Sequence, residues 1–248
     1  HTYVEELYNR GCRQFIVEKI LSVSLPQANI FLVEDTVNAL QKVVSLQRQR
    51  YSLPVVGVTG SNGKTIVKEW LSQLLSQKWQ VIKSPRSYNS QIGVPLSVWQ
   101  INEQHQQAVF EAGISRVGEM AKLQPIIMPT SGIFTNIGPA HGEGFQGLSQ
   151  KAEEKALLFK DCRSIVYRKD YPEVDEALTS RLEKEKLASW STKQVQGARW
   201  EVSYSVNDLN EAAVKIKLAS TQQAYHFIFH YVDEASLENV THCIIFLL

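Results

Sequence analysis

An apolar run that breaks into a glycine-rich turn limits what this chain can fold into more than any other feature. From Val55 to Thr65 the sequence reads Val-Val-Gly-Val-Thr-Gly-Ser-Asn-Gly-Lys-Thr. The run predicts a buried strand over residues 55–59, and apolar residues at helical spacing after it predict an amphipathic helix with Lys68 largely on its polar face. In this order, the backbone amides of the turn and of the helix N-terminus converge on an anion. The segment therefore predicts a nucleotide-phosphate cradle.

The residue types of the turn suit that role. Glycine accommodates sharp or left-handed backbone, the ammonium of Lys64 adds positive charge for the outer phosphates, and the hydroxyl of Thr65 can bind the accompanying magnesium ion. The turn is shorter than the common phosphate loop, which needs glycine at position 58, where the chain has valine. An ordinary strand-to-helix turn with a solvated lysine is the alternative. We expect the nucleotide to be bound by Gly60, Ser61, Asn62, Gly63, Lys64 and Thr65.

Length and composition fit a soluble enzyme. The chain has 248 residues, 44% of them hydrophobic, which is enough to bury a sizeable core. With 26 basic and 25 acidic residues, it has no global field to attract nucleic acid or an anionic membrane. Its three cysteines are too few and too far apart for a disulfide framework or a cysteine-based zinc site, which favours a reducing, cytoplasmic setting. No apolar stretch reaches about 18 residues, so we expect no membrane insertion.

The pattern along the chain predicts two regions of an α/β protein. Residues 1–52 indicate a partial N-terminal domain with helices and two short strands, and Pro54 marks the boundary. From residue 53 onward strands and helices alternate, with a helix expected over 172–186, which predicts a mostly parallel sheet flanked by helices. Three later segments alternate with period two and predict a small antiparallel sheet: residues 200–204, 214–218 and 225–229.

The ends of the sequence also predict that the second region, residues 53–248, is truncated at its C-terminal end. The chain starts at His1 without an initiator methionine, and it ends in an apolar, helix-like run without a stop signal. The gene product is therefore expected to be longer.

Three side chains after the phosphate turn stand out, because ligands of α/β sheets bind beyond the carboxyl ends of the strands. Glu111 ends one predicted strand, where its carboxylate can bind magnesium opposite Thr65. His141 follows the strand that ends at Phe134, and Lys155 lies in a predicted helix. If each is considered alone, the simplest interpretation is that Glu111 is a glutamate in solvent, His141 a structural histidine and Lys155 a solvated lysine. They indicate a site only together.

Four ordered motifs extend this pattern. They are Thr59-Gly60-Ser61-Asn62-Gly63-Lys64-Thr65, Tyr88-Asn89-Ser90-Gln91-Ile92-Gly93-Val94-Pro95-Leu96, Phe110-Glu111-Ala112-Gly113 with Gly118-Glu119, and Thr135-Asn136-Ile137-Gly138-Pro139-Ala140-His141. In this order they resemble the landmarks of the Mur ligase family, and most closely those of its members that add D-alanyl-D-alanine to UDP-N-acetylmuramoyl-tripeptide. The resemblance covers the end of the family's first, UDP-substrate domain and most of its ATP-binding central domain.

The resemblance implies an ATP-dependent amide-bond ligase of peptidoglycan precursor synthesis that works through an acyl phosphate. Its partners would be UDP-N-acetylmuramoyl-tripeptide and D-alanyl-D-alanine, and its cofactors ATP and Mg²⁺. Lys155, preferred to Lys151 because of the apolar run after it, matches a lysine that is carbamylated in the family. The residues that match catalytic positions are Lys64, Glu111, His141 and Lys155. Those that match magnesium ligands are Thr65, Glu111, His141 and Lys155, and Asn89 and Asn239 match nucleotide-binding positions.

The sequence also departs from the family pattern. Ser90 stands where these ligases often have a second asparagine, and an acidic segment, residues 233–239, replaces the usual His-Asn pair but keeps Asn239. The acidic variant resembles ligases fused to an alanine racemase. Two other hypotheses remain: a folylpolyglutamate synthase-like ligase of the same ATP-binding family, and a nucleotide-binding fragment without catalysis.

Overall fold

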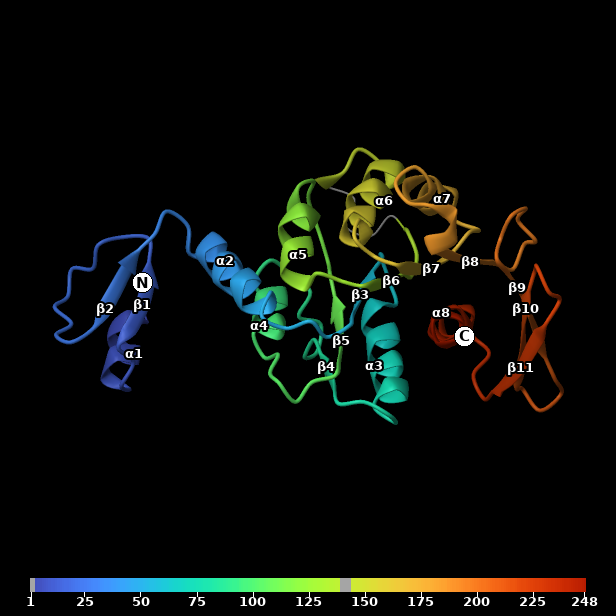
Figure 1. Ribbon diagram of the computed structural model, residues 1–248, viewed down its shortest axis with the longest axis horizontal. Helices are drawn as coiled ribbons and strands as arrows, with labels where there is room; N and C mark the ends of the chain where they lie inside the picture. The colour runs from blue at the N-terminus through green and yellow to red at the C-terminus, as the bar shows by residue number, and fades with distance from the viewer. Residues whose placement is uncertain (1–2, 139–143) are drawn as a thin grey trace.

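The computed structural model describes residues 3–138 and 144–248. In its N-terminal unit a short helix precedes two parallel strands, and Figure 1 shows this unit at the opposite end of the molecule from strand β11. A longer helix, α2, connects the unit to the main body and starts where the Asp35 carboxylate accepts a hydrogen bond from the Asn38 amide. Val44 of α2 packs into the core of the main body. The elements are α1 (Val4–Asn9), β1 (Gln14–Val17), β2 (Asn29–Leu32) and α2 (Thr36–Arg48).

A nine-stranded sheet with the order β11-β10-β9-β8-β7-β6-β3-β5-β4 forms the main body. Neighbouring strands are parallel from β4 to β9, whereas β10 pairs antiparallel with both β9 and β11. The strands that follow β3 in the sequence lie on both sides of it, with β5 and β4 on one side and β6 and β7 on the other. Ligands of α/β proteins bind at the carboxyl ends of the strands where the strand order reverses in this way, which here is the end of β3. The strands are β3 (Val55–Thr59), β4 (Val81–Lys83), β5 (Gln107–Glu111), β6 (Ser131–Phe134), β7 (Ser164–Arg168), β8 (Leu187–Ser191), β9 (Trp200–Val206), β10 (Ala212–Leu218) and β11 (Ala224–Phe229).

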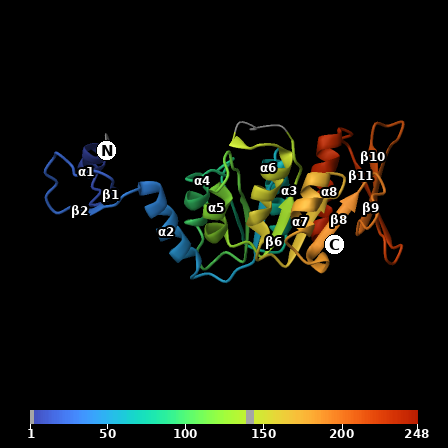
Figure 2. The ribbon, with the colours of Figure 1, turned by 90° about the horizontal axis from the view of Figure 1, so that it is seen from above.

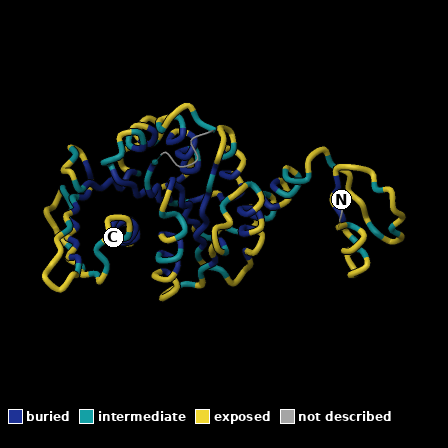
Figure 3. The backbone as a smooth tube through the Cα atoms, turned by 180° about the vertical axis from the view of Figure 1, so that it is seen from behind, coloured by how far each residue is buried: buried dark blue, intermediate teal, exposed yellow. Residues whose placement is uncertain are grey.

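Helices cover both faces of the sheet and give three layers, as Figures 1 and 2 show. Val56 and Val58 of β3 pack with one pair of helices, whereas Val55 packs with the helices of the opposite face, because side chains alternate along a strand. Figure 3 shows buried residues along the sheet and mostly exposed ones in the N-terminal unit. One face carries α3 (Lys64–Leu75) and α8 (Glu234–Leu247). The other carries α4 (Gly93–Val98), α5 (Glu119–Ile127), α6 (Leu148–Ala156), which continues as the 3₁₀ turn η2 (Leu157–Phe159), and α7 (Pro172–Thr179).

The predicted fold class is confirmed, with two differences in detail. The antiparallel strands extend the parallel sheet through the pairs Trp190–Trp200 and Ser191–Glu201 of β8 and β9. The helix expected over 172–186 ends at Thr179 and is followed by the 3₁₀ turn η3 (Lys184–Lys186) and by β8. All five residues of β8 are buried, so it shows no polar–apolar alternation that would have marked it as a strand.

Candidate active site

The turn after β3 is fixed by the segment that leaves β6. The amides of Ser61 and Asn62 donate to the backbone carbonyl and to the side-chain oxygen of Asn136, each at 2.9 Å. The hydroxyl of Thr135 donates to the carbonyl of Asn62 at 2.5 Å. Because these bonds occupy the two amides in the middle of the turn, anion binding depends mainly on the amides that follow.

Helix α3 starts directly after the turn. Gly63 is its N-cap, with a φ of 79° in the left-handed region, and a β-carbon there would lie 2.2 Å from the side-chain oxygen of Asn239 in α8. The first hydrogen bond of the helix runs from the Val67 amide to the Gly63 carbonyl. The amides just before Val67 therefore have no partner within the helix. Together with the helix dipole they place partial positive charge at this end of α3.

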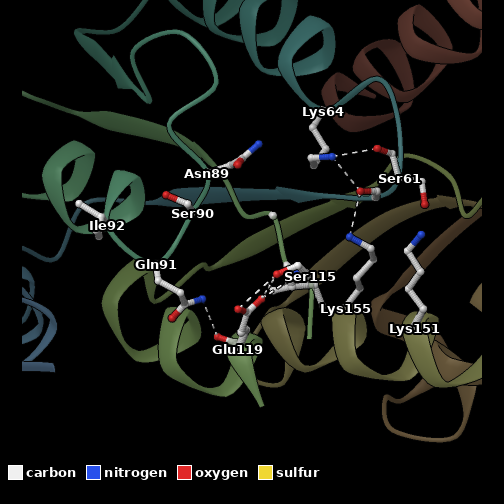
Figure 4. A pocket seen from close by; sticks show the side chains of 13 residues that line it. Ser61, Lys64, Asn89, Ser90, Gln91, Ile92, Ser115, Glu119, Lys151 and Lys155 are labelled. Carbon is white, nitrogen blue, oxygen red and sulfur yellow. Dashed lines mark hydrogen bonds between the residues drawn. The ribbon is translucent and has the colours of Figure 1, made fainter. Parts of the chain in front are cut away.

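Two lysines converge on one carbonyl of the turn, as Figure 4 shows. The ammonium of Lys64 donates to the carbonyls of Gly60 at 2.9 Å and Ser61 at 3.0 Å. Lys155, from α6, donates to the same Gly60 carbonyl at 3.0 Å. Like charges at one acceptor repel each other, so an anion between the two lysines would be strongly favoured.

Lys155 carries an unusual pKa for a lysine. Its side chain is only 2% exposed, and burial, followed by the charges of Lys64 and Lys151, lowers its pKa from 10.5 to about 7. Lys151, one helical turn earlier, is also buried and donates to the carbonyl of Gly138 at 2.7 Å. At neutral pH a large share of Lys155 is therefore an uncharged amine, which is the nucleophilic form.

Glu111 ends β5, next to β3 in the sheet. It is fully buried, and its Oε2 accepts a hydrogen bond from the Thr65 hydroxyl at 2.9 Å. Its Oε1 has no hydrogen-bond partner within the part of the chain that the structure describes. Burial raises the pKa of Glu111, and the Thr65 hydrogen bond and the charges of Lys68 and Lys64 oppose this effect.

The donor atoms around Glu111 fit a magnesium ion. A buried carboxylate oxygen without a partner is costly, and Mg²⁺ prefers oxygen ligands, typically one or two carboxylates together with water and substrate phosphates. Glu111 and the Thr65 hydroxyl supply such oxygens beside the phosphate turn. Among residues 3–138 and 144–248 no group of three or more His, Cys, Asp or Glu side chains gathers as a metal site, so a bound ion would depend on phosphate oxygens for its remaining ligands.

Two hollows meet at the turn. The larger has a volume of about 350 Å³, and its lining includes Lys64, Asn89, Ser115 and Lys155, which Figure 4 labels. The smaller, of about 280 Å³, is lined by residues 61–66 together with Ser87 and Asn89. Lys64 and Asn89 border both hollows, so a nucleotide phosphate in the smaller one would face a second substrate in the larger one.

The structure brings together most of the residues that the sequence singled out. Gly60, Lys64, Asn89 and Lys155 line the larger hollow, and Glu111 accepts a hydrogen bond from Thr65, which lines the smaller one. Asn239 packs against Gly63 from α8. Lys155, and not Lys151, reaches Gly60, although both line the hollow. His141 lies outside the described residues.

One prediction for this region is wrong, and two contacts were missed. Lys68 does not lie on an exposed face of α3 but is fully buried, because the connection after β4 covers it. Thr135 and Asn136 anchor the turn, a role that their place in a predicted loop did not indicate.

Residues 58–246 match the family model of the Mur ligase middle domain, and the chain belongs to the Mur ligase family. It is 35% identical over 173 residues to the UDP-N-acetylmuramoyl-tripeptide–D-alanyl-D-alanine ligase of Treponema pallidum, covering 64% of this chain and 37% of that protein. The ligase of the same name from Bacillus subtilis is 32% identical over 182 residues, or 71% of this chain and 39% of that protein. The chain thus spans well under half the length of these relatives.

Solved structures agree with this membership. The MurF ligase of Thermotoga maritima in complex with ADP superimposes with a TM-score of 0.83 at 25% identity, over 100% of this chain and 56% of that one. An FPGS–AMPPCP complex, at 14% identity and a TM-score of 0.64 over 84% of this chain and 61% of that one, shares the fold alone. Among the described residues, no helix combines the length and the apolar character needed to cross a membrane.

Proposed function

We propose that the full-length protein is an ATP-dependent ligase of peptidoglycan precursor synthesis, acting in the cytoplasm, that joins D-alanyl-D-alanine to UDP-N-acetylmuramoyl-tripeptide. The observation that carries the proposal is the buried pair of Glu111 and Thr65, with an unpartnered carboxylate oxygen, beside a turn where Lys64 and Lys155 converge. Membership in the Mur ligase family supports the reaction class. The names of the relatives support the two substrates.

The reaction joins a carboxylate to an amine in two steps. A carboxylate oxygen of the tripeptide attacks the γ-phosphorus of ATP, and the bond to the leaving ADP oxygen breaks, which gives an acyl phosphate. The amine of D-alanyl-D-alanine then attacks the acyl carbon and loses a proton, and phosphate leaves as the amide forms. The first step brings two anions together, so positioning and charge neutralisation dominate it. Lys64 and the amides at the start of α3 supply positive charge next to the transferring group.

Magnesium, when bound, would neutralise phosphate oxygens. Thr65 and Glu111 would hold one ion, His141 would help to place a second, and a modified Lys155 would lie near both. The uncharged amine of Lys155 can attack carbon dioxide and lose one proton, which forms a carbamate with a negative charge. This change replaces a cation that would repel magnesium with oxygen ligands that suit it. The carbamate nitrogen keeps one hydrogen, so it can still donate to the Gly60 carbonyl.

An isotope experiment tests the reaction class. With heavy oxygen in the acceptor carboxylate of the tripeptide, we expect the label in the phosphate that the full-length protein releases, because the oxygen that attacks ATP leaves with the phosphate. Mass spectrometry of the phosphate measures the transfer. Formation of AMP and pyrophosphate instead would exclude an acyl phosphate and contradict the proposal.

A folylpolyglutamate synthase-like ligase is the runner-up, and the same isotope result would apply to it. Its support is the shared fold of the FPGS–AMPPCP complex at 14% identity. The motifs around Asn89 and Glu119 and the named relatives favour the first function. Competition binding between a folate and UDP-N-acetylmuramoyl-tripeptide separates the two.

Residues 1–248 on their own are expected to bind ATP without completing the reaction. They hold the phosphate turn, but they match only 37% of the Treponema pallidum relative and 39% of the Bacillus subtilis relative. Equilibrium dialysis with labelled ATP and an assay for phosphate release, both on this segment, measure the two properties. Sustained turnover by the segment alone would refute the expectation.

A further inference from the structure

Lys68 lies one helical turn after Lys64 in α3 and has no part in the function proposed above. Its side chain is fully buried. Its ammonium donates to the carbonyl of Ser84 at 2.7 Å and to that of Arg86, and it lies 3.1 Å from Oε1 of Glu69. A buried ammonium is tolerated only when it is paired and hydrogen-bonded. Lys68 is therefore a fixed part of the interior, unlike a surface lysine that bends toward water.

The two carbonyls belong to the connection after β4, and this connection reaches the magnesium site. The hydroxyl of Ser84 accepts a hydrogen bond from the amide of Glu111 at 3.2 Å. The hydroxyl of Ser87 lies 3.3 Å from that of Thr65. Arg86, between the two serines, has a φ of 48°, in the left-handed region that residues with a β-carbon seldom adopt. A backbone in this conformation persists only when its surroundings hold it, and Lys68 binds the carbonyls on both sides of residue 85.

Lys68 differs in its contacts from the other lysine of α3. Its ammonium donates to the carbonyls of the connection after β4. Lys64, the other lysine of this helix face, donates instead to Gly60 and Ser61. The two lysines of α3 therefore bind different segments, Lys64 the phosphate turn and Lys68 the connection after β4.

We infer that Lys68 is a positioning residue for the magnesium–phosphate site, which holds residues 84–87 against α3 so that Ser87 and Glu111 present their oxygens beside Thr65. The inference rests on the proposed function, because it takes Thr65 and Glu111 as the place where the magnesium–nucleotide complex binds. Because its ammonium contacts Ser84, Arg86 and Glu69, Lys68 would act only through these groups.

Calorimetric titration of the full-length protein with ADP, once in excess Mg²⁺ and once in a chelator, tests the inference. Lys68→Met is expected to weaken ADP binding about 10–100-fold in Mg²⁺, the usual cost of removing a group that orients a metal ligand. Binding in the chelator should stay at the wild-type value, because the turn and the helix N-terminus are intact. Lys68→Arg keeps the charge and the hydrogen-bond donors, so it should restore most of the magnesium effect, which is the gain in ADP affinity on going from chelator to Mg²⁺. The matched control is Lys83→Met, since Lys83 pairs with the same Glu69 but is 41% exposed.

A second variant covers the case in which Lys68→Met does not fold. Lys68→Gln keeps a hydrogen-bond donor but loses the charge, and it should also show a reduced magnesium effect. Equal losses with Mg²⁺ and with chelator would indicate a purely structural role and overturn the inference, as would wild-type behaviour of both neutral variants. If the wild-type protein binds ADP equally well with and without Mg²⁺, the proposed function fails and the inference with it.

Discussion

Exchange of Glu111 for glutamine should nearly abolish ligation while the protein stays folded. Glutamine has the same shape, but it lacks the charge with which a carboxylate binds a hard cation. Metal stabilisation of a transferring phosphoryl group contributes several kcal/mol, so kcat/KM for the full-length protein should fall by about three orders of magnitude. Steady-state assays of phosphate release and ADP titrations in Mg²⁺ measure the loss.

The stability of Glu111→Gln should move in the opposite direction. Burial raises the pKa of Glu111 above its ordinary value of 4.5, so this carboxyl binds a proton more readily in the folded protein than in the unfolded chain. At a pH above that value the unfolded chain ionises this carboxyl freely, whereas the folded chain must bury its charge, which lowers the free energy of unfolding. Glutamine removes this cost, so at neutral pH the unfolding midpoint of the variant should equal or exceed that of the wild type. Glu111 would then lower the stability of the fold while it supports ligation.

Glu154→Gln is the matched control for this substitution. Glu154 is also buried, but its Oε1 accepts hydrogen bonds from the amides of Gly118 at 2.9 Å and Met120 at 3.0 Å, at the start of α5. We expect it to lose about 1 kcal/mol of stability and to keep its ligation rate per folded molecule. Activity of Glu111→Gln within about tenfold of the wild type, or a loss fully explained by unfolding, would contradict a metal-binding role for Glu111.

The fold was predictable wherever the local pattern and the final burial agree. The five residues of β3 are all buried, and their sequence is a continuous run without charged residues. A strand covered by helices on both faces is expected to have such a run, because neither of its faces meets water. β10 alternates, with Val214 and Ile216 buried and Lys215 exposed, because helices cover only its inner face. β8 could not be predicted, because its sequence Leu-Ala-Ser-Trp-Ser has no β-branched residue. It becomes a strand only through pairing with β7 and β9.

The site was predictable where its residues are close in sequence or end neighbouring strands. Thr65 meets Glu111 because β3 and β5 run parallel with Val58 opposite Glu111, which brings both strand ends to one edge of the sheet. The contacts made by connecting segments were not predictable. Lysine is almost never fully buried, so the burial of Lys68 follows only from the path of the connection after β4. In the same way, the path of the segment after β6 places Asn136 where it accepts hydrogen bonds from the central amides of the turn.

Truncation of Lys155 to alanine should lower ligation by about a hundredfold, and added acetate should restore part of the activity. The loss removes a carbamate that would hold magnesium, and losses of metal-orienting groups reach this size. Acetate can enter the space and supply a carboxylate in its place. In the wild type, activity should also fall as the pH drops below about 7, the pKa of Lys155, because only the uncharged amine attacks carbon dioxide. Rates at several pH values, with and without bicarbonate, measure this dependence.

Lys151→Ala separates the modification from a general need for positive charge. Lys151 lies in the same helix and is buried, and burial lowers its pKa as well, but its ammonium donates to Gly138 and not to the phosphate turn. Acetate should therefore not restore any activity that this variant loses. Carbon NMR with labelled bicarbonate should show a carbamate in the wild type and in Lys151→Ala, and none in Lys155→Ala. If the carbamate signal instead persists in Lys155→Ala and disappears in Lys151→Ala, the modified residue is Lys151, and the convergence of Lys155 on Gly60 serves only to place a positive charge at the turn.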